Sequence, residues 1–197
     1  TITAAPTAVI SYAGTPYCSD IATGQAVTLT GTNAYTGGSF SASPAGLTID
    51  ASTGAITPSG STAGTYTVTY TIPASAGCAS STVSTTLTII AVPQITLTSS
   101  VASTNQTICV NTAIANITYA FSGSATGVNV VGLPAGVTAS TTGNVVTISG
   151  TPTTTTGSPF NYAINTFGGT CGNATATGTI TVNNPGSLNL FCDGANS

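Results

Sequence analysis

The chain has 197 residues, no Lys, Arg or His, and only three acidic residues, which gives a formal net charge of -3. A chain without cations cannot neutralise phosphate groups, so nucleic acid is excluded as a partner. The usual general bases and Lys nucleophiles are absent as well, which predicts a protein that is not an enzyme and uses no cofactor. The length fits one large domain or two small ones.

Hydroxyl side chains dominate the polar residues. Thr and Ser account for 65 of the 197 residues, and hydrophobic residues for 41%. This mixture is typical of strands with an aliphatic inner face and a Thr outer face. No run approaches the roughly 20 apolar residues needed to cross a bilayer, so we expect no direct membrane insertion. The sequence has no initiating Met and no signal peptide, and we expect an internal or processed piece of a longer chain.

In the first half of the chain, strand periodicity is clearest over residues 65–72. Thr alternates there with four apolar residues, namely Tyr66, Val68, Tyr70 and Ile72. A period of two predicts a half-buried strand. The next strand is predicted from three residues on one face, Val83, Leu87 and Ile89. Ser52-Thr53-Gly54 predicts a three-residue hairpin in which Gly54 takes the left-handed conformation.

The second half shows the same kind of alternation. One strand is predicted from Phe160, Tyr162 and Ile164, and another from Ala174, Ala176, Ile180 and Val182. Apolar residues at helical spacing are absent, which favours an all-β fold.

An internal repeat divides the chain. Residues 43–48 recur 90 positions later as residues 133–138, and Pro6, Pro93 and Pro185 mark candidate boundaries. A module of about 90 residues fits a seven-stranded sandwich. We therefore predict tandem β-sandwiches with the boundaries 1–92 and 93–184, and assign 185–197 to the first strand of a further, truncated repeat.

The five cysteines follow the same repeat. Cys18 and Cys78 are 60 positions apart, and Cys109 and Cys171 are 62 positions apart. Two nearly equal intervals predict one disulfide in each module, Cys18–Cys78 and Cys109–Cys171, formed in an oxidising compartment. A zinc site is the alternative, but it would require closer Cys spacing and usually His. Cys192 is unpaired in this scheme, and we expect its partner to lie outside these residues.

Two motifs carry a resemblance to a known family. Residues 44–56, Pro-Ala-Gly-Leu-Thr-Ile-Asp-Ala-Ser-Thr-Gly-Ala-Ile, resemble the immunoglobulin-like and cadherin-like modules of bacterial surface proteins, as does the second copy at 132–152. The segments that end in Cys18 and Cys109 are similar to repeats of the giant gliding-motility surface adhesins of Bacteroidota, which the type IX system secretes.

The resemblance implies the function and its setting. The chain would be a structural repeat segment of a long, filamentous adhesin on the bacterial cell surface, attached to the outer membrane and used in gliding motility. Its partners would be neighbouring repeats of the same chain, an external surface or polysaccharide, and the secretion and gliding machinery. A fimbrial shaft subunit is a weaker alternative.

Tyrosines near predicted loops support a different hypothesis. Tyr12, Tyr17 and Tyr35 could form a platform on which sugar rings stack, as in a carbohydrate-binding accessory module of a secreted multidomain hydrolase. Packing inside the module is the simpler interpretation. Tyr66 resembles a tyrosine corner, in which the hydroxyl locks onto the backbone.

The acidic residues suggest no catalytic or metal site. Asp50 lies in an Asp-Ala-Ser-Thr-Gly stretch, but an aspartic protease needs two adjacent carboxylates and the second copy has Ser140 at this offset. We therefore interpret Asp50 as a turn cap. Calcium requires six to eight oxygen ligands, which three scattered acids cannot supply, although Asp20 could contribute one. We predict no metal site.

Overall fold

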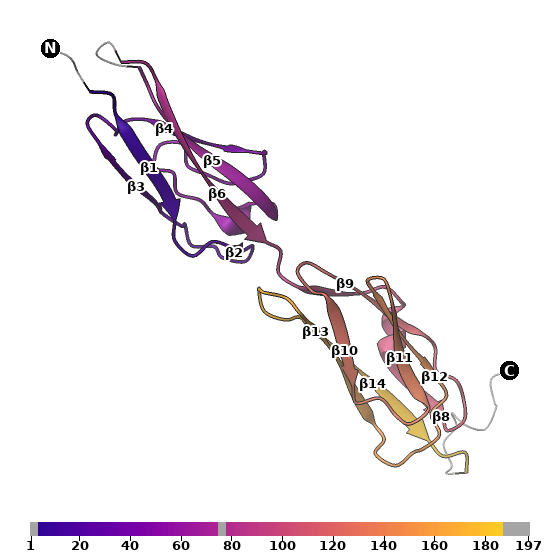
Figure 1. Ribbon diagram of the computed structural model, residues 1–197. Helices are drawn as coiled ribbons and strands as arrows, with labels where there is room; N and C mark the ends of the chain where they lie inside the picture. Colours follow the sequence, from indigo (N-terminus) through magenta and orange to yellow (C-terminus); the bar gives the residue numbers. More distant parts are fainter. Residues whose placement is uncertain (1–3, 75–77, 187–197) are drawn as a thin grey trace. The chain divides into compact units, whose positions relative to one another are not determined.

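The chain folds into two β-rich units. A computed structural model describes residues 4–74 and 78–186. The units are Thr1–Ala91 and Val92–Ser197, here called module 1 and module 2 (Figure 1). The division falls one residue before the boundary expected from the repeat. Of the segment 185–197, only Pro185 and Gly186 are described, so the predicted strand there lies largely outside the described residues.

The described residues of module 1 form six strands in two sheets. They are β1 (Thr7–Tyr12), β2 (Tyr17–Cys18), β3 (Val27–Thr32), β4 (Ser39–Ser43), β5 (Gly64–Ile72) and β6 (Ser81–Ile90). One sheet pairs β1 with β3, and the other has the order β2-β6-β5-β4. A short 3-10 turn, η1 (Pro58–Gly60), lies between β4 and β5.

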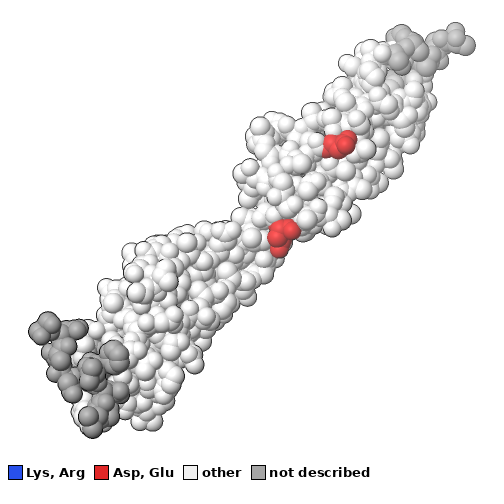
Figure 2. All heavy atoms as spheres, turned by 180° about the vertical axis from the view of Figure 1, so that it is seen from behind, with Lys and Arg blue, Asp and Glu red and all other residues white. Residues whose placement is uncertain are grey.

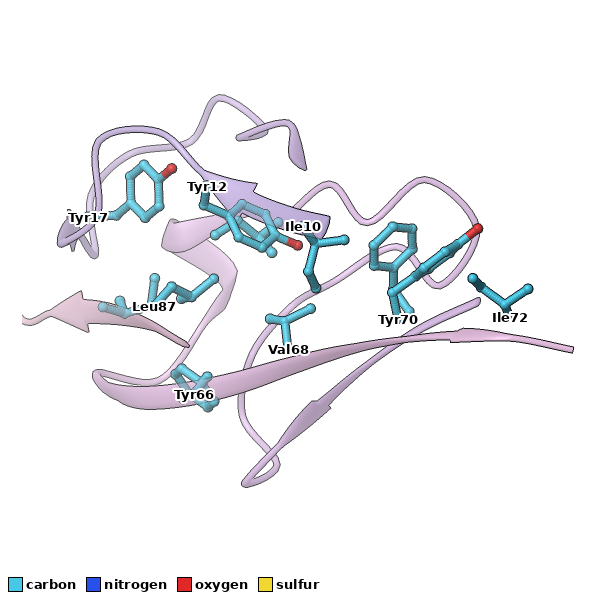
Figure 3. Close-up of a cluster of buried hydrophobic side chains, with 11 residues drawn as sticks. Ile10, Tyr12, Tyr17, Tyr66, Val68, Tyr70, Ile72 and Leu87 are labelled. Atoms are coloured by element: carbon cyan, nitrogen blue, oxygen red, sulfur yellow. The ribbon is translucent and has the colours of Figure 1, made fainter. Parts of the chain in front are cut away.

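The core of module 1 follows the predicted alternation along β5. Tyr66, Val68, Tyr70 and Ile72 are all buried, whereas Thr65 and Thr67 are exposed. Leu87 from β6 and Ile10 from β1 belong to the same cluster (Figure 3), as does Ile89. The predicted strand and its inward face are confirmed.

In module 2, residues 92–186 form eight strands. They are β7 (Gln94–Leu97), β8 (Asn105–Cys109), β9 (Ile117–Ser122), β10 (Gly127–Val131), β11 (Val137–Thr142), β12 (Val145–Gly150), β13 (Phe160–Phe167) and β14 (Thr175–Asn183). They form two four-stranded sheets, β11-β12-β9-β7 and β10-β13-β14-β8. A 3-10 turn, η2 (Val101–Thr104), precedes β8.

The two modules share the same strand topology. β2 runs parallel to β6, and β8 runs parallel to β14, while the other ladders are antiparallel. In module 1 Ile56 forms isolated bridges to Gln25 and Ile49, where module 2 has the full hairpin β11–β12. The described residues contain no α-helix. The predicted all-β class and the tandem sandwiches are confirmed.

Within the described ranges, no helix is long and apolar enough to pass through a lipid bilayer.

Candidate functional site

The two cysteines of module 1 lie at opposite ends of its last strand. Cys18 in β2 faces Ile90, the final residue of β6, and the Ser19 amide donates to the Ile90 carbonyl at 2.8 Å. Cys78 precedes Ser81, the first residue of β6. At about 3.3 Å per residue, Ser81 and Ile90 lie about 30 Å apart. Cys18 is therefore at the end where the chain leaves the module, here called the outgoing end, and Cys78 is at the incoming end.

Module 2 repeats this arrangement. Cys109 in β8 faces Asn183, the last residue of β14, and Cys171 precedes Thr175, the first residue of that strand. The length of β14 separates the two strand ends by about 26 Å. Cys109 thus lies at the outgoing end and Cys171 at the incoming end.

The predicted pairing within each module is wrong. A disulfide requires Cα atoms about 4.4–6.8 Å apart. Three residues from Cys78 to Ser81, or four from Cys171 to Thr175, could bridge at most about 11 or 14 Å even if they folded back along the strand. Cys18–Cys78 and Cys109–Cys171 are therefore excluded, although Cys18, Cys109 and Cys171 are each disulfide-bonded. Cys192 lies outside the described residues.

The tyrosines proposed as a sugar platform lie largely inside module 1. Tyr12 and Tyr17 are only 7% and 5% exposed, and Figure 3 shows both rings among the buried side chains. The Tyr12 hydroxyl donates to the Gly54 carbonyl at 2.5 Å, and the Tyr17 hydroxyl donates to the Ala13 carbonyl. Burial raises the pKa of Tyr12 to about 12, with a smaller contribution from the nearby Tyr17.

The third member, Tyr35, is half-buried and packs on Gly31, where an ideal Cβ would lie 2.6 Å from the Tyr35 Cγ. The three rings therefore offer no exposed stacking platform, and that hypothesis is wrong. Tyr12 is buried because it continues the inward face of β1, after Ala8 and Ile10, which also pack in this core.

The tyrosine corner is confirmed. Tyr66 is buried at the start of β5, and its hydroxyl donates to the Thr62 carbonyl at 2.6 Å. This bond ties the strand to the loop that precedes it, a structural role.

Asp50 caps the turn that leads to Gly54, as predicted. Its Oδ1 accepts hydrogen bonds from the Ser52 and Thr53 amides, both at 2.8 Å. The hydrogen bond from the Thr53 amide, and then that from Ser52, lowers the pKa of the Asp50 carboxyl below its usual value. Gly54 takes the left-handed conformation with φ of +73°. The carboxylate therefore has a local partner for its charge and a structural role.

Potential metal ligands are scattered. Among residues 4–74 and 78–186, no three His, Cys, Asp or Glu side chains form a group that could hold an ion. Asp20 is exposed in the turn after Cys18.

The exposed strand faces carry hydroxyl groups in place of charges. Thr65 and Thr88 pair across β5 and β6 with their Oγ1 atoms 3.1 Å apart, and Thr7 and Thr32 pair across β1 and β3 at 2.6 Å. Figure 2 shows a face that is almost entirely uncoloured, with two small acidic patches and no basic one. The modules thus present a nearly neutral, hydroxyl-rich surface.

Sequence reasoning missed which end of its module each cysteine occupies. The available signal was the order along the chain, because Cys18 and Cys109 end an early strand of their modules, β2 and β8, whereas Cys78 and Cys171 lie a few residues before the last strand.

Comparisons with known proteins agree with this fold. Residues 1–90 match the family described as Putative Ig domain (He_PIG). The insect immune protein hemolin is similar over 82% of this chain and 42% of its own, with 14% identity and a TM-score of 0.51. This likeness shows an immunoglobulin-like fold.

Two other solved structures align with this chain over most of its length. The titin domains Z1Z2, solved in complex with telethonin, align with 93% of this chain and 99% of theirs, at 15% identity and a TM-score of 0.39. Cadherin domains 3–6 of protocadherin gamma B2 align with 88% and 47%, at 17% identity and a TM-score of 0.40. No curated protein matches the sequence.

Proposed function

We propose that this chain is a structural repeat segment of a long, filamentous cell-surface adhesin that attaches bacteria to surfaces or polysaccharide during gliding. Immunoglobulin-like modules are typical of extracellular adhesion proteins and of structural repeats. One observation carries the proposal: two modules with the same strand topology follow each other directly along the chain, since β6 ends at Ile90 and β7 begins at Gln94. Each module has its own buried core.

The surface chemistry supports attachment through many weak contacts. Hydroxyl groups on the strand faces can bond to sugars or to hydrated solids without opposite charges on the partner. A single contact of this kind is weak, but repeated modules on one chain raise the effective concentration of each further contact. Adhesion would therefore come from the number of modules.

The proposed setting follows the same hypothesis. The adhesin would be secreted by the type IX system and remain attached to the outer membrane. Its partners would be neighbouring repeats, an external surface or polysaccharide, and the gliding machinery. The rival hypothesis of a carbohydrate-binding accessory module loses its specific support, because Tyr12 and Tyr17 are buried.

Adhesion under varied salt tests the proposal. Beads coated with this chain should attach to polysaccharide-coated glass with less than a twofold change between about 10 mM and 1 M NaCl, because the modules have almost no exposed charge to screen. Beads coated with a cationic protein serve as the control and should detach at high salt. A tenfold loss of attachment by the coated beads would refute the contact chemistry.

Electron microscopy of the native polypeptide tests the filament. A very large chain that forms a beaded filament supports the adhesin, whereas a protein of ordinary size with a catalytic domain would overturn it.

A further inference from the structure

Module 2 carries an exposed aromatic ring on the outer face of the sheet β10-β13-β14-β8. In β13, Tyr162, Ile164 and Thr166 are buried, so the residues that alternate with them point away from the core. Phe167, the last residue of β13, continues this outward set and is 52% exposed. Phe is normally among the most buried side chains, so a half-exposed ring on a regular strand requires an explanation.

The Phe167 ring lies flat on the neighbouring strand β10 (Figure 1). Gly127 of β10 is its partner across the ladder. A Cβ placed on Gly127 would be 2.5 Å from the Phe167 Cζ and 3.0 Å from both Cε atoms. Equal distances to the two Cε atoms, only slightly longer than that to Cζ, place this Cβ above the ring plane and not beyond its edge. One face of the ring therefore covers the buried glycine, and the opposite face is open to solvent.

Two amide side chains lie on the same outer face of β13. Asn165 is two residues before Phe167, and Asn161 is four residues before Asn165. Their Oδ1 atoms accept hydrogen bonds from the hydroxyls of Thr175 and Thr179 of β14, at 2.8 and 3.0 Å. Within residues 4–74 and 78–186, no protein group accepts from either Nδ2. Each amide is thus held by its oxygen and keeps its N–H donors for an outside partner.

The ring and the amides form an uncharged strip along the strands. Six residues separate Asn161 from Phe167, a length of about 20 Å at 3.3 Å per residue. Asn129 of β10, which is exposed and pairs with Asn165, widens the strip. The chain has no basic residue and no acidic residue between 92 and 186. A flat aromatic face beside amide donors, without charge, fits a neutral ligand that presents both C–H and hydroxyl groups.

Module 1 has no such groups on the corresponding sheet. There, every outward residue of the β4–β5 and β5–β6 ladders is a Ser or a Thr, namely Ser39, Ser41, Ser43, Thr65, Thr67, Thr69, Thr71, Thr82, Ser84, Thr86 and Thr88. The same fold therefore forms without an aromatic ring or amides on this face. Their presence in module 2 is not explained by the stability of the sandwich.

We propose that the strip of Phe167, Asn165, Asn161 and Asn129 is a binding site for a neutral polysaccharide. The C–H face of a pyranose ring stacks on the electron-rich open face of Phe167. Its hydroxyl oxygens accept hydrogen bonds from the Nδ2 groups of Asn165 and Asn161. The inference rests on the proposed attachment to polysaccharide and assigns one contact of that attachment to β13.

Titration of the whole chain with soluble neutral oligosaccharides tests the site. Cellohexaose, laminarihexaose and mannohexaose are the probes, and NMR follows the Phe167 ring and the side-chain amides of Asn165 and Asn161. Saturable shifts at these groups are expected with at least one probe. Absence of saturable shifts with all three probes up to about 10 mM, where even weak contacts are detected, would overturn the proposal. Shifts confined to other residues would overturn it as well.

Substitutions at Phe167 separate stacking from a structural role. Phe167→Leu keeps an apolar side chain over Gly127 but removes the flat ring, and it should weaken binding by about tenfold. Phe167→Tyr keeps the ring and should bind within about twofold of the parent. Val101→Ala is the matched control, because Val101 is a 78% exposed apolar residue of the same module in η2, outside this sheet. Unchanged binding by Phe167→Leu, or an equal loss in Val101→Ala, would contradict the site.

The bead assay distinguishes this site from the proposed function. Beads coated with Phe167→Leu should attach to polysaccharide-coated glass several-fold less than beads coated with the parent chain. If parent beads do not attach at all, the proposed function itself fails. If parent and Phe167→Leu beads attach equally well, the proposed function stands and the site on β13 is refuted.

Discussion

Module 1 and module 2 close the same corner of the sandwich with different groups. In module 1, Tyr66 pairs with Leu87, which lies three residues before Ile90, the partner of Cys18. In module 2, Phe160 pairs with Ile180, which lies three residues before Asn183, the partner of Cys109. Tyr66 and Phe160 are therefore equivalent. Phe160 has no hydroxyl, and the Ser158 Oγ nearby accepts instead from the Val182 amide at 2.9 Å.

The buried phenol also changes place between the modules. In module 1, Tyr70 donates to the Tyr35 carbonyl at 2.9 Å and accepts from the Gly38 amide at 2.8 Å. In module 2, Tyr162 is equivalent to Val68, and its hydroxyl has only long contacts, 3.4 Å to the Thr104 carbonyl and 3.5 Å to the Tyr119 hydroxyl. The two modules therefore have the same strand topology, but the side-chain hydrogen bonds that stabilise it come from different positions.

The largest effect is expected where each phenol lies against a glycine. A Cβ on Gly178 would collide with the Tyr162 hydroxyl and the Thr104 carbonyl, and a Cβ on Gly38 would lie 2.6 Å from the Tyr70 Cζ. Gly178→Ala and Gly38→Ala should each destabilise their own module by about 3 kcal/mol, since overpacking a rigid core forces backbone shifts.

Urea unfolding of the whole chain, with hydrogen exchange to assign each transition to a module, measures this effect. Gly24→Ala is the control, because the nearest atom to its Cβ is 3.9 Å away, and it should change stability by less than about 0.5 kcal/mol. Equal effects from the three substitutions would show that close packing against the phenols is not the cause.

Two further substitutions, Tyr70→Phe and Tyr162→Phe, each remove only the hydroxyl group of a buried tyrosine. Tyr70→Phe leaves the Gly38 amide and the Tyr35 carbonyl without their partner and should cost about 2 kcal/mol. Tyr162→Phe removes only long contacts and should cost at most about 0.5 kcal/mol. The same unfolding measurement checks both values, and a larger loss for Tyr162→Phe would reverse the comparison.

The smallest expected effect is a loss of stability of module 1 at low pH. The pKa of Asp50 is lowered in the folded state, so its contribution to stability is fully present above the unfolded value of about 4. It is lost as the pH falls through the lowered folded pKa. Module 2 has no acidic residue between 92 and 186, so acid should weaken module 1 and leave module 2 nearly unchanged.

Calorimetry between pH 5 and pH 2 measures this difference. Asp50→Asn should remove this contribution to the acid sensitivity of module 1. An unchanged pH dependence in that variant would show that another group is responsible.

The core could be predicted because strand alternation is a local signal. Tyr66, Val68 and Tyr70 face inward as their spacing requires. The burial of Tyr17 could not be predicted from periodicity, because β2 is only two residues long and has no period to detect. The burial of Tyr12 had only a weak local signal, because Ala8 is a small hydrophobic residue at the start of the alternation that continues with Ile10 and Tyr12.

The cysteine pairing failed for a different reason. Intervals of 60 and 62 positions report the length of the repeat. They show that Cys18 and Cys109 are equivalent, as are Cys78 and Cys171, but not which cysteines face each other. The register of β2 on β6 supplies that information, and it depends on pairing between segments about 70 residues apart.

The parallel pairing at the edge of each module has a mechanical consequence. Because β8 runs parallel to β14, an early strand pulled toward the start of the chain and a last strand pulled toward its end would slide along each other, so the hydrogen bonds between them would be loaded together. The shorter pairing of β2 with β6 gives module 1 the same geometry.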